Sequence, residues 1–268
     1  MTPLDGVPAP AQPEDCLLTV AALCAAHWTQ PLTPREGDGA ALSSPGHLVI
    51  RRTGVVGLPW TSDQFCEIDP APLLALVDDE KAQERDFQKV LAQFRDAGAP
   101  VMESAALWAY LMTLEEVGFG IHLHPMVVTQ ILCSPRARQF ADRRMTPQEV
   151  TGTGCASVLV NYADPGLESA REMKRRVVYW RSRFKAVPRI LLLANNGIIL
   201  LGPDVTSLME RLEDLARHAK NFVGASMLGG PVFLTPTNVE KLQRIYGLPV
   251  FGVGAPEKEQ SGAVPFGG

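Results

Sequence analysis

The chain has 268 residues, of which 46% are hydrophobic and 20% are charged, so it is long enough to bury a full core and lies at the upper end of single-domain sizes. Its formal charge of -4 argues against nucleic acid as a partner, because neutralising a phosphate backbone needs a basic surface. No run approaches the roughly 20 apolar residues of a membrane span, and residues 1–15 lack the basic-then-apolar order of a signal peptide. We therefore expect no membrane partner and a soluble, cytoplasmic protein.

The two ends of the chain differ in composition from the rest. The first 13 residues carry four prolines, and the last dozen are rich in glycine and proline. Such segments seldom pack on a core. We expect flexible segments at 1–14 and 251–268 on either side of one domain at 15–250.

The cysteines are scattered and do not form a CxxC pair. An odd number without such pairs favours buried or free thiols over a disulfide framework or a zinc knuckle. Reduced thiols are typical of a cytosolic protein. The five positions are Cys16, Cys24, Cys66, Cys133 and Cys155.

Apolar spacing predicts alternating helices and strands along the first half of the chain. In chain order we expect a helix at 16–28, a loop at 31–46, strands at 47–51 and 64–68, a helix at 72–77, polar loop with exposed helix at 78–98, and a helix at 103–117.

The second half continues this α/β pattern. We expect a strand at 119–124, a helix at 126–133, a connection at 135–154, a strand at 157–162, a helix at 167–184, a hairpin of strands at 190–194 and 198–201, a helix capped by Asp204 or Thr206, and a last helix with Thr237 and Glu240 as capping box.

Two histidines, His122 and His124, close the strand expected at 119–124. The strand period of two places both imidazoles on one face, about 6 to 7 Å apart at their Cα atoms. That spacing suits two ligands of one metal ion. It also suits two polar side chains on the exposed face of a strand, so spacing alone leaves both interpretations open.

Several motifs, taken together, resemble the class II aldolase/adducin family over most of the chain. They are closest to the aldolase part of the rhamnose-utilisation (rhamnulose-phosphate aldolase-like) proteins. The motifs are His-Leu-Val-Ile-Arg-Arg-Thr-Gly at 47–54, Pro-Val-Met-Glu at 100–103, Ile-His-Leu-His-Pro at 121–125, Tyr-x-Asp-Pro-Gly at 162–166, Leu-Ala-Asn-Asn-Gly at 193–197 and Met-Leu-Gly-Gly-Pro at 227–231.

The resemblance implies a three-layer α/β/α domain with a largely antiparallel central sheet, assembled as a homo-oligomer, a tetramer in this family. It further implies a lyase that uses a divalent metal, zinc in particular, and a glutamate acid/base on a small carbonyl or sugar-derived substrate. The positions that match are the metal ligands His122 and His124, the acid/base Glu103, Asn196 at the third ligand position, and the substrate-binding residues Thr53, Gly54 and Tyr162.

The chain departs from the family pattern at two places. Asn196 stands where the family has a histidine, and Val101 and Met102 replace small hydroxyl residues that bind phosphate. One interpretation is an enzyme acting on an unphosphorylated or acidic carbonyl compound. The other is a non-catalytic aldolase/adducin-like domain that serves binding or assembly.

Two further features of the sequence favour simpler explanations. His218 falls on the polar side of its expected helix, where a structural or solvated role is the better expectation. Gly152-Thr-Gly-Cys155 is similar to a phosphate-binding loop but lacks the following Lys-Ser/Thr. We expect no nucleotide there.

Overall fold

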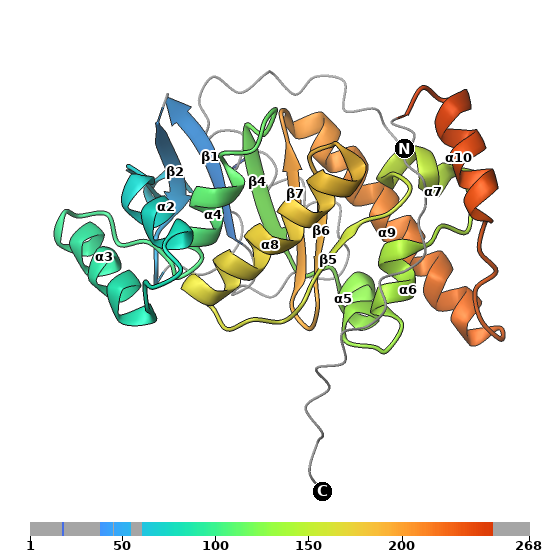
Figure 1. Cartoon of the computed structure of the whole chain (residues 1–268), viewed down its shortest axis with the longest axis horizontal. Helices are drawn as coiled ribbons and strands as arrows, with labels where there is room; N and C mark the ends of the chain where they lie inside the picture. Colours follow the sequence, from blue (N-terminus) through green and yellow to red (C-terminus); the bar gives the residue numbers. More distant parts are fainter. Residues whose placement is uncertain (1–17, 19–37, 45, 55–60, 249–268) are drawn as a thin grey trace, which may run out of the picture.

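One mixed sheet organises the computed structural model, which describes residues 18, 38–44, 46–54 and 61–248 (Figure 1). The strand order is β3-β2-β1-β4-β7-β6-β5. Neighbouring strands are antiparallel except for the parallel pair β5 and β6. The strands are β1 (Asp38–Ser44), β2 (His47–Arg51), β3 (Phe65–Ile68), β4 (Phe119–Leu123), β5 (Val158–Val160), β6 (Ile190–Leu193) and β7 (Gly197–Gly202).

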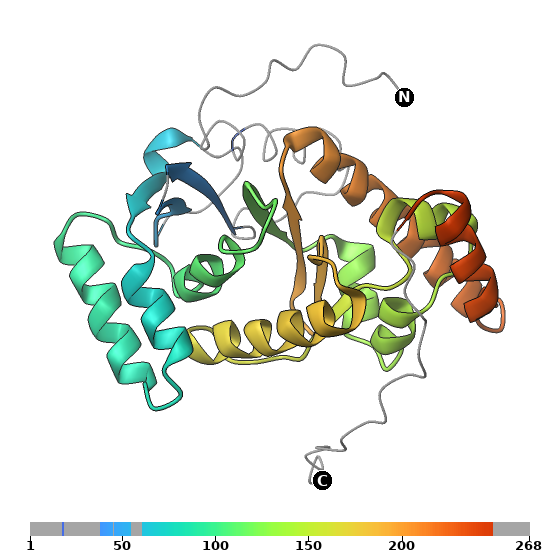
Figure 2. The same cartoon turned by 45° about the horizontal axis from the view of Figure 1, so that its top comes forward.

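Helices cover both faces of the sheet, which confirms the expected three layers (Figure 2). One buried cluster joins the first face to α2 (Ala71–Asp78), α4 (Ala105–Leu111) and α8 (Leu167–Phe184). A second cluster joins the other face to α5 (Met126–Leu132) and α9 (Val205–Met227). The remaining helices are α3 (Glu84–Asp96), α6 (Ala137–Asp142), α7 (Pro147–Thr153) and α10 (Pro236–Ile245).

The hairpin of β6 and β7 shows why both faces are covered. Leu191 and Leu193 enter the first cluster, and Ile190 and Leu192 enter the second, since successive side chains of a strand point to opposite faces. A strand that is apolar on both faces must be buried on both. The expected pairing across residues 195–197 is confirmed.

Two segments that we expected to be loops are regular structure. Residues 38–44 form β1, which pairs with β2 on one side and β4 on the other. Its Gly and Ala residues have low strand propensity, and two neighbouring strands override that preference. The expected connection at 135–154 contains α6 and α7. Helix α7 begins where Thr146 accepts a hydrogen bond from the Glu149 N–H.

Helix boundaries differ from expectation near the caps. Helix α4 begins at Ala105, so Glu103 lies in the turn before it rather than in its first turn. The last helix is capped by the side chain of Thr235 and not by Thr237. Asp204 caps α9 as expected, by accepting from the Ser207 N–H.

Some predictions fall outside the described residues. They are the segments at 1–14 and 251–268 and, apart from Leu18, the helix at 16–28. The single domain expected at 15–250 stays a prediction. In the described part of the chain, no helix is both long and apolar enough to cross a membrane.

Candidate functional site

The side chain of His122, in strand β4, lies on the sheet face that α4 and α8 cover. Its neighbours Ile121 and Leu123 belong to the cluster on the opposite face, so the alternation of the strand directs the imidazole the other way. In the register of the sheet, His122 lies between Asp38 of β1 and Ile199 of β7. Residues directly opposite one another share a face, which brings Asp38 and His122 to one side.

The rings of His122 and His124 lie side by side, with centroids 4.6 Å apart. Nε2 of His122 and Nδ1 of His124 are buried and have no hydrogen-bond partner among the described residues. Nε2 of His124 lies 2.9 Å from Oδ1 of Asn196. Burial and, to a smaller extent, the neighbouring His124 lower the pKa of His122 to about 3. His122 is therefore a neutral imidazole, the form that can bind a metal ion.

Gly197 is required by the close approach of the β6–β7 hairpin to His124. A Cβ atom on Gly197 would lie 2.4 Å from the carbonyl oxygen of Leu123 and 2.8 Å from Cδ2 of His124. Asn195, two residues before it, has the positive φ of 58° that the turn needs, a conformation that asparagine tolerates. The Asn-Asn-Gly turn thus holds Asn196 against His124.

Substituting Gly197 by alanine is expected to destabilise the protein by about 2 kcal/mol, because the added methyl group must displace backbone and the His124 ring. Chemical denaturation measures this loss. Gly224→Ala is the matched control, since a Cβ there meets nothing within 4 Å in α9, and alanine should stabilise the helix by up to about 1 kcal/mol. Equal effects of the two substitutions would contradict the packing argument.

Asp38 is a buried carboxylate of this site that sequence reasoning missed. Its Oδ2 accepts a short hydrogen bond from the Ser104 hydroxyl and a 2.6 Å bond from Nε1 of Trp108. Its Oδ1 accepts from the Gly39 N–H at 2.7 Å. Burial raises the pKa of Asp38, while these three donors and the Arg51 guanidinium oppose the rise. The Asp38 side chain therefore links β1 by hydrogen bonds to the start of α4, where Ser104 directly follows Glu103.

These residues surround a cavity of about 470 Å³. Among the predicted site residues, the cavity is lined by Glu103, His122, His124, Asn196, Thr53 and Tyr162, but Gly54 is not part of its lining. Glu103 is exposed. The hydroxyl of Tyr162 donates to Asp164, and the side chain is 62% exposed, so it lies at the rim.

The lining is acidic and apolar. Its charged side chains are Asp38 and Glu103, and no lysine or arginine occurs among the described residues that line it. The remainder is mostly apolar, including Leu107, Trp108 and Met173. A phosphate group here would find no lysine or arginine among the described lining residues, although a buried anion needs a cationic partner.

Two imidazoles and one amide oxygen are the donor groups that the described site offers to a divalent ion. Nε2 of His122 is buried and has no hydrogen-bond partner in the described structure, and Oδ1 of Asn196 lies beside His124. The described residues contain no group of three His, Cys, Asp or Glu side chains that could hold a metal. The arrangement therefore differs from a three-histidine zinc site by one imidazole.

The sheet order and the covering helices define the fold of the class II aldolases. No family model matches the chain, and no curated protein matches it. Solved structures do: an L-fuculose 1-phosphate aldolase matches with a TM-score of 0.60 and 14% identity, over 88% of this chain and 95% of that chain.

Two further structures agree on the fold. The N-terminal class II aldolase domain of a conserved protein from Thermoplasma acidophilum has a TM-score of 0.61 and 17% identity, over 83% of this chain and 99% of its own. YgbL from Klebsiella pneumoniae has a TM-score of 0.59 and 16% identity, over 85% of this chain and 98% of its own. At such identities the likeness establishes the fold, and the activity must be argued from the site.

Proposed function

We propose that this protein is an aldolase-like lyase that cleaves an unphosphorylated, sugar-derived or other small carbonyl compound with the help of a divalent metal ion. One observation carries the proposal. Two imidazoles meet at the end of β4, each with one buried ring nitrogen that has no hydrogen-bond partner among the described residues, in a cavity that a glutamate also lines. An inert scaffold would not need these groups in one place.

His122 and His124 are the residues that would hold the metal ion, with Oδ1 of Asn196 as a third, weaker donor. When bound, such an ion polarises the carbonyl of a substrate as a Lewis acid. Zinc is the ion we expect from the fold. Iron and manganese also tolerate a mixture of imidazole and amide oxygen ligands.

Glu103 is the residue we assign to proton transfer. Its carboxylate lies at the cavity wall, one residue before the Ser104 that Asp38 fixes. In a retro-aldol cleavage, a base takes the proton of the hydroxyl at the carbon that becomes the new carbonyl. The C–C bond then breaks, and its electron pair is taken up by the carbonyl-bearing fragment, which is finally protonated. A carboxylate in this position can remove and return that proton.

The substrate class follows from the charge of the lining. The names of the aldolase neighbours specify a phosphorylated sugar, yet no lysine or arginine lines the described part of this cavity, and Asp38 and Glu103 would repel an anion. We therefore assign a neutral substrate with several hydroxyl groups, in contrast to the phosphorylated sugar that the resemblance to rhamnulose-phosphate aldolase-like proteins implies. Thr53 and Tyr162 are placed to contact it.

A second function, a non-catalytic binding or assembly domain, is favoured by a different observation. Nε2 of His124 already pairs with Oδ1 of Asn196, which satisfies both groups without a metal ion. The tetramer and the cytoplasmic location stay predictions under either function.

Metal analysis of protein purified without a histidine tag tests the proposal. We expect about one equivalent of a divalent metal in the parent and none in a His122→Ala, His124→Ala double variant. His47→Ala is the matched control, because His47 is exposed at the start of β2, and it should retain the metal.

Turnover separates the roles of the residues. Glu103→Gln should keep the metal and lose about 100-fold or more in kcat on the substrate found by screening neutral sugars. Parent protein that contains no metal and takes none up from zinc or manganese would exclude the lyase and leave the binding domain.

A further inference from the structure

A second cavity, of about 520 Å³, lies at the other end of β6 from the histidine site. Leu193, at the last position of this strand, lines the first cavity. Arg189 and Ile190, at its beginning, line the second. Four residues of strand span about 10 Å, so the two cavities are separate but share one rigid element.

The second cavity carries the basic side chains that the first one lacks. Its lining includes Lys185, Arg189 and Arg211 against the two acids Glu115 and Glu116. Arg189 is paired, since it donates to the backbone carbonyl of Glu116 at 3.0 Å and forms an ion pair with its carboxylate. Glu115 forms an ion pair with Arg181. Both glutamates of this lining thus already form ion pairs with arginine.

Arg211 forms no salt bridge within the described part of the chain, although the carboxylates of Asp204 and Glu210 act on it electrostatically. Its one hydrogen bond within the described structure goes from Nη1 to the Ser207 carbonyl at 3.4 Å. Burial and, after it, repulsion by Arg189 lower the pKa of Arg211, and Asp204 and Glu210 oppose this shift. Two guanidinium groups that repel each other in a partly buried position are stabilised by an anion between them.

A donor without an acceptor lies in the same wall. Nε1 of Trp180 is buried and has no hydrogen-bond partner among the described residues. The indole ring is held in place by stacking on Phe184, with centroids 3.9 Å apart. A buried N–H without an acceptor is unfavourable, and an acceptor atom of a ligand would satisfy it.

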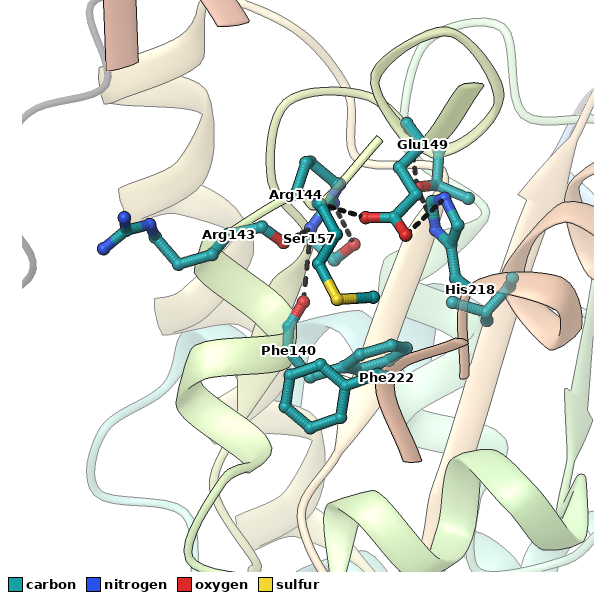
Figure 3. Close-up of a pocket in the computed structure, with 10 residues that line it drawn as sticks. Phe140, Arg143, Arg144, Glu149, Ser157, His218 and Phe222 are labelled. Carbon is teal, nitrogen blue, oxygen red and sulfur yellow. Dashed lines mark hydrogen bonds and ion pairs between the residues drawn. The ribbon is translucent and has the colours of Figure 1, made fainter. Parts of the chain in front are cut away.

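The turn at 152–154 forms another part of the wall, and a buried polar cluster behind it holds the turn in place (Figure 3). Nε of Arg144 donates to the Gly154 carbonyl at 2.7 Å, and its Nη2 donates to the Ser157 hydroxyl. Thr153 Oγ1 lies 3.1 Å from Nδ1 of His218. The loop that is similar to a phosphate loop in sequence therefore lines this cavity as a fixed surface.

We propose that this second cavity binds a small molecule with a carboxylate or phosphate group, held by Arg211 and Arg189, and with an acceptor atom opposite Nε1 of Trp180. This site is independent of the lyase proposal. The shared chemistry is an anion of one or more charges on a compact molecule, since a cavity of about 520 Å³ has the volume of a small-molecule site.

Calorimetric titration with inorganic phosphate and, separately, with citrate tests the site. We expect at least one of the two to bind the parent at millimolar concentration or below, with Arg211→Gln weakening the binding about tenfold or more. Arg217→Gln is the matched control, because Arg217 lies on the same helix, is exposed, and pairs with Asp214. It should leave the binding unchanged.

The indole N–H signal provides the second measurement. In ¹H–¹⁵N spectra, the signal lost in Trp180→Phe should be the one that shifts when the binding anion is added. Binding of phosphate alone would identify a phosphate ester, and binding of citrate alone a carboxylate. Absence of binding by both anions at about 20 mM, or equal weakening by the Arg211 and Arg217 substitutions, would overturn the proposal, because the interaction would then be absent or a general charge effect.

Discussion

Asp38→Ala is expected to lower the free energy of unfolding by about 3 kcal/mol or more. The substitution removes the acceptor of three hydrogen bonds, from the Gly39 N–H, the Ser104 hydroxyl and Nε1 of Trp108. Trp108 is fully buried, so its N–H would find no water in place of the carboxylate. Leaving buried donors unpaired costs about 1 to 3 kcal/mol each, and removing one charge of a buried set costs more.

Urea denaturation followed by tryptophan fluorescence would measure this loss. Asp38→Asn keeps the shape and one acceptor oxygen, so it should cost less than the alanine variant. Asp63→Ala removes an exposed aspartate and should stay within about 0.5 kcal/mol of the parent. An Asp38→Ala protein as stable as the Asp63→Ala protein would show that the three hydrogen bonds contribute nothing net.

His218 should make the protein less stable as the pH falls from about 6.5 toward 3. Burial and, to a smaller extent, the charges of Arg144 and Arg217 lower the pKa of His218 to about 3. The unfolded chain, with an ordinary histidine pKa of about 6.5, binds a proton in this interval that the folded protein does not. The contribution of His218 to the free energy of unfolding is therefore fully present above pH 6.5 and is lost on acidification. The loss is about 3 kcal/mol at pH 4.

Comparison with a variant isolates this contribution from other groups. Burial raises the pKa of Glu149, which lies 3.7 Å from His218, so Glu149 changes stability with pH in the opposite direction to His218. His122 changes it in the same direction as His218. His218→Asn can keep the hydrogen bond with Thr153 and removes the titration. The difference in unfolding free energy between parent and variant should change with pH between 6.5 and 4. A constant difference would contradict the prediction.

The sequence predicts best those helices and strands whose local pattern of residues is sufficient to specify them. Helix α8 has the predicted bounds of 167–184, and the two strands of the β6–β7 hairpin are confirmed, because long apolar patterns and an Asn-Gly turn are strong local signals. Strand β1 has no such signal. It is a strand because β2 and β4 supply partners on both sides.

The same distinction applies to the candidate site. The spacing of His122 and His124 predicted two neighbouring imidazoles, and their rings do lie 4.6 Å apart. Asp38 could not be found in this way, since its partners Ser104 and Trp108 are 66 and 70 residues further along the chain. For His218 the sequence left a structural and a solvated role open, and it is buried, because α7 covers a side of α9 that the helical period alone marks as polar.

The opposite charge of the two cavities has a consequence for how solutes approach the molecule. Asp38 and Glu103 lie near the last residues of β6, whereas Arg189 and Arg211 lie near its first. Potentials of this kind act over a Debye length, about 8 Å at physiological ionic strength. An anion would be drawn toward the first residues of β6 and away from its last before it makes a contact, whereas a neutral sugar would be steered to neither end, and added salt would remove the steering of the anion.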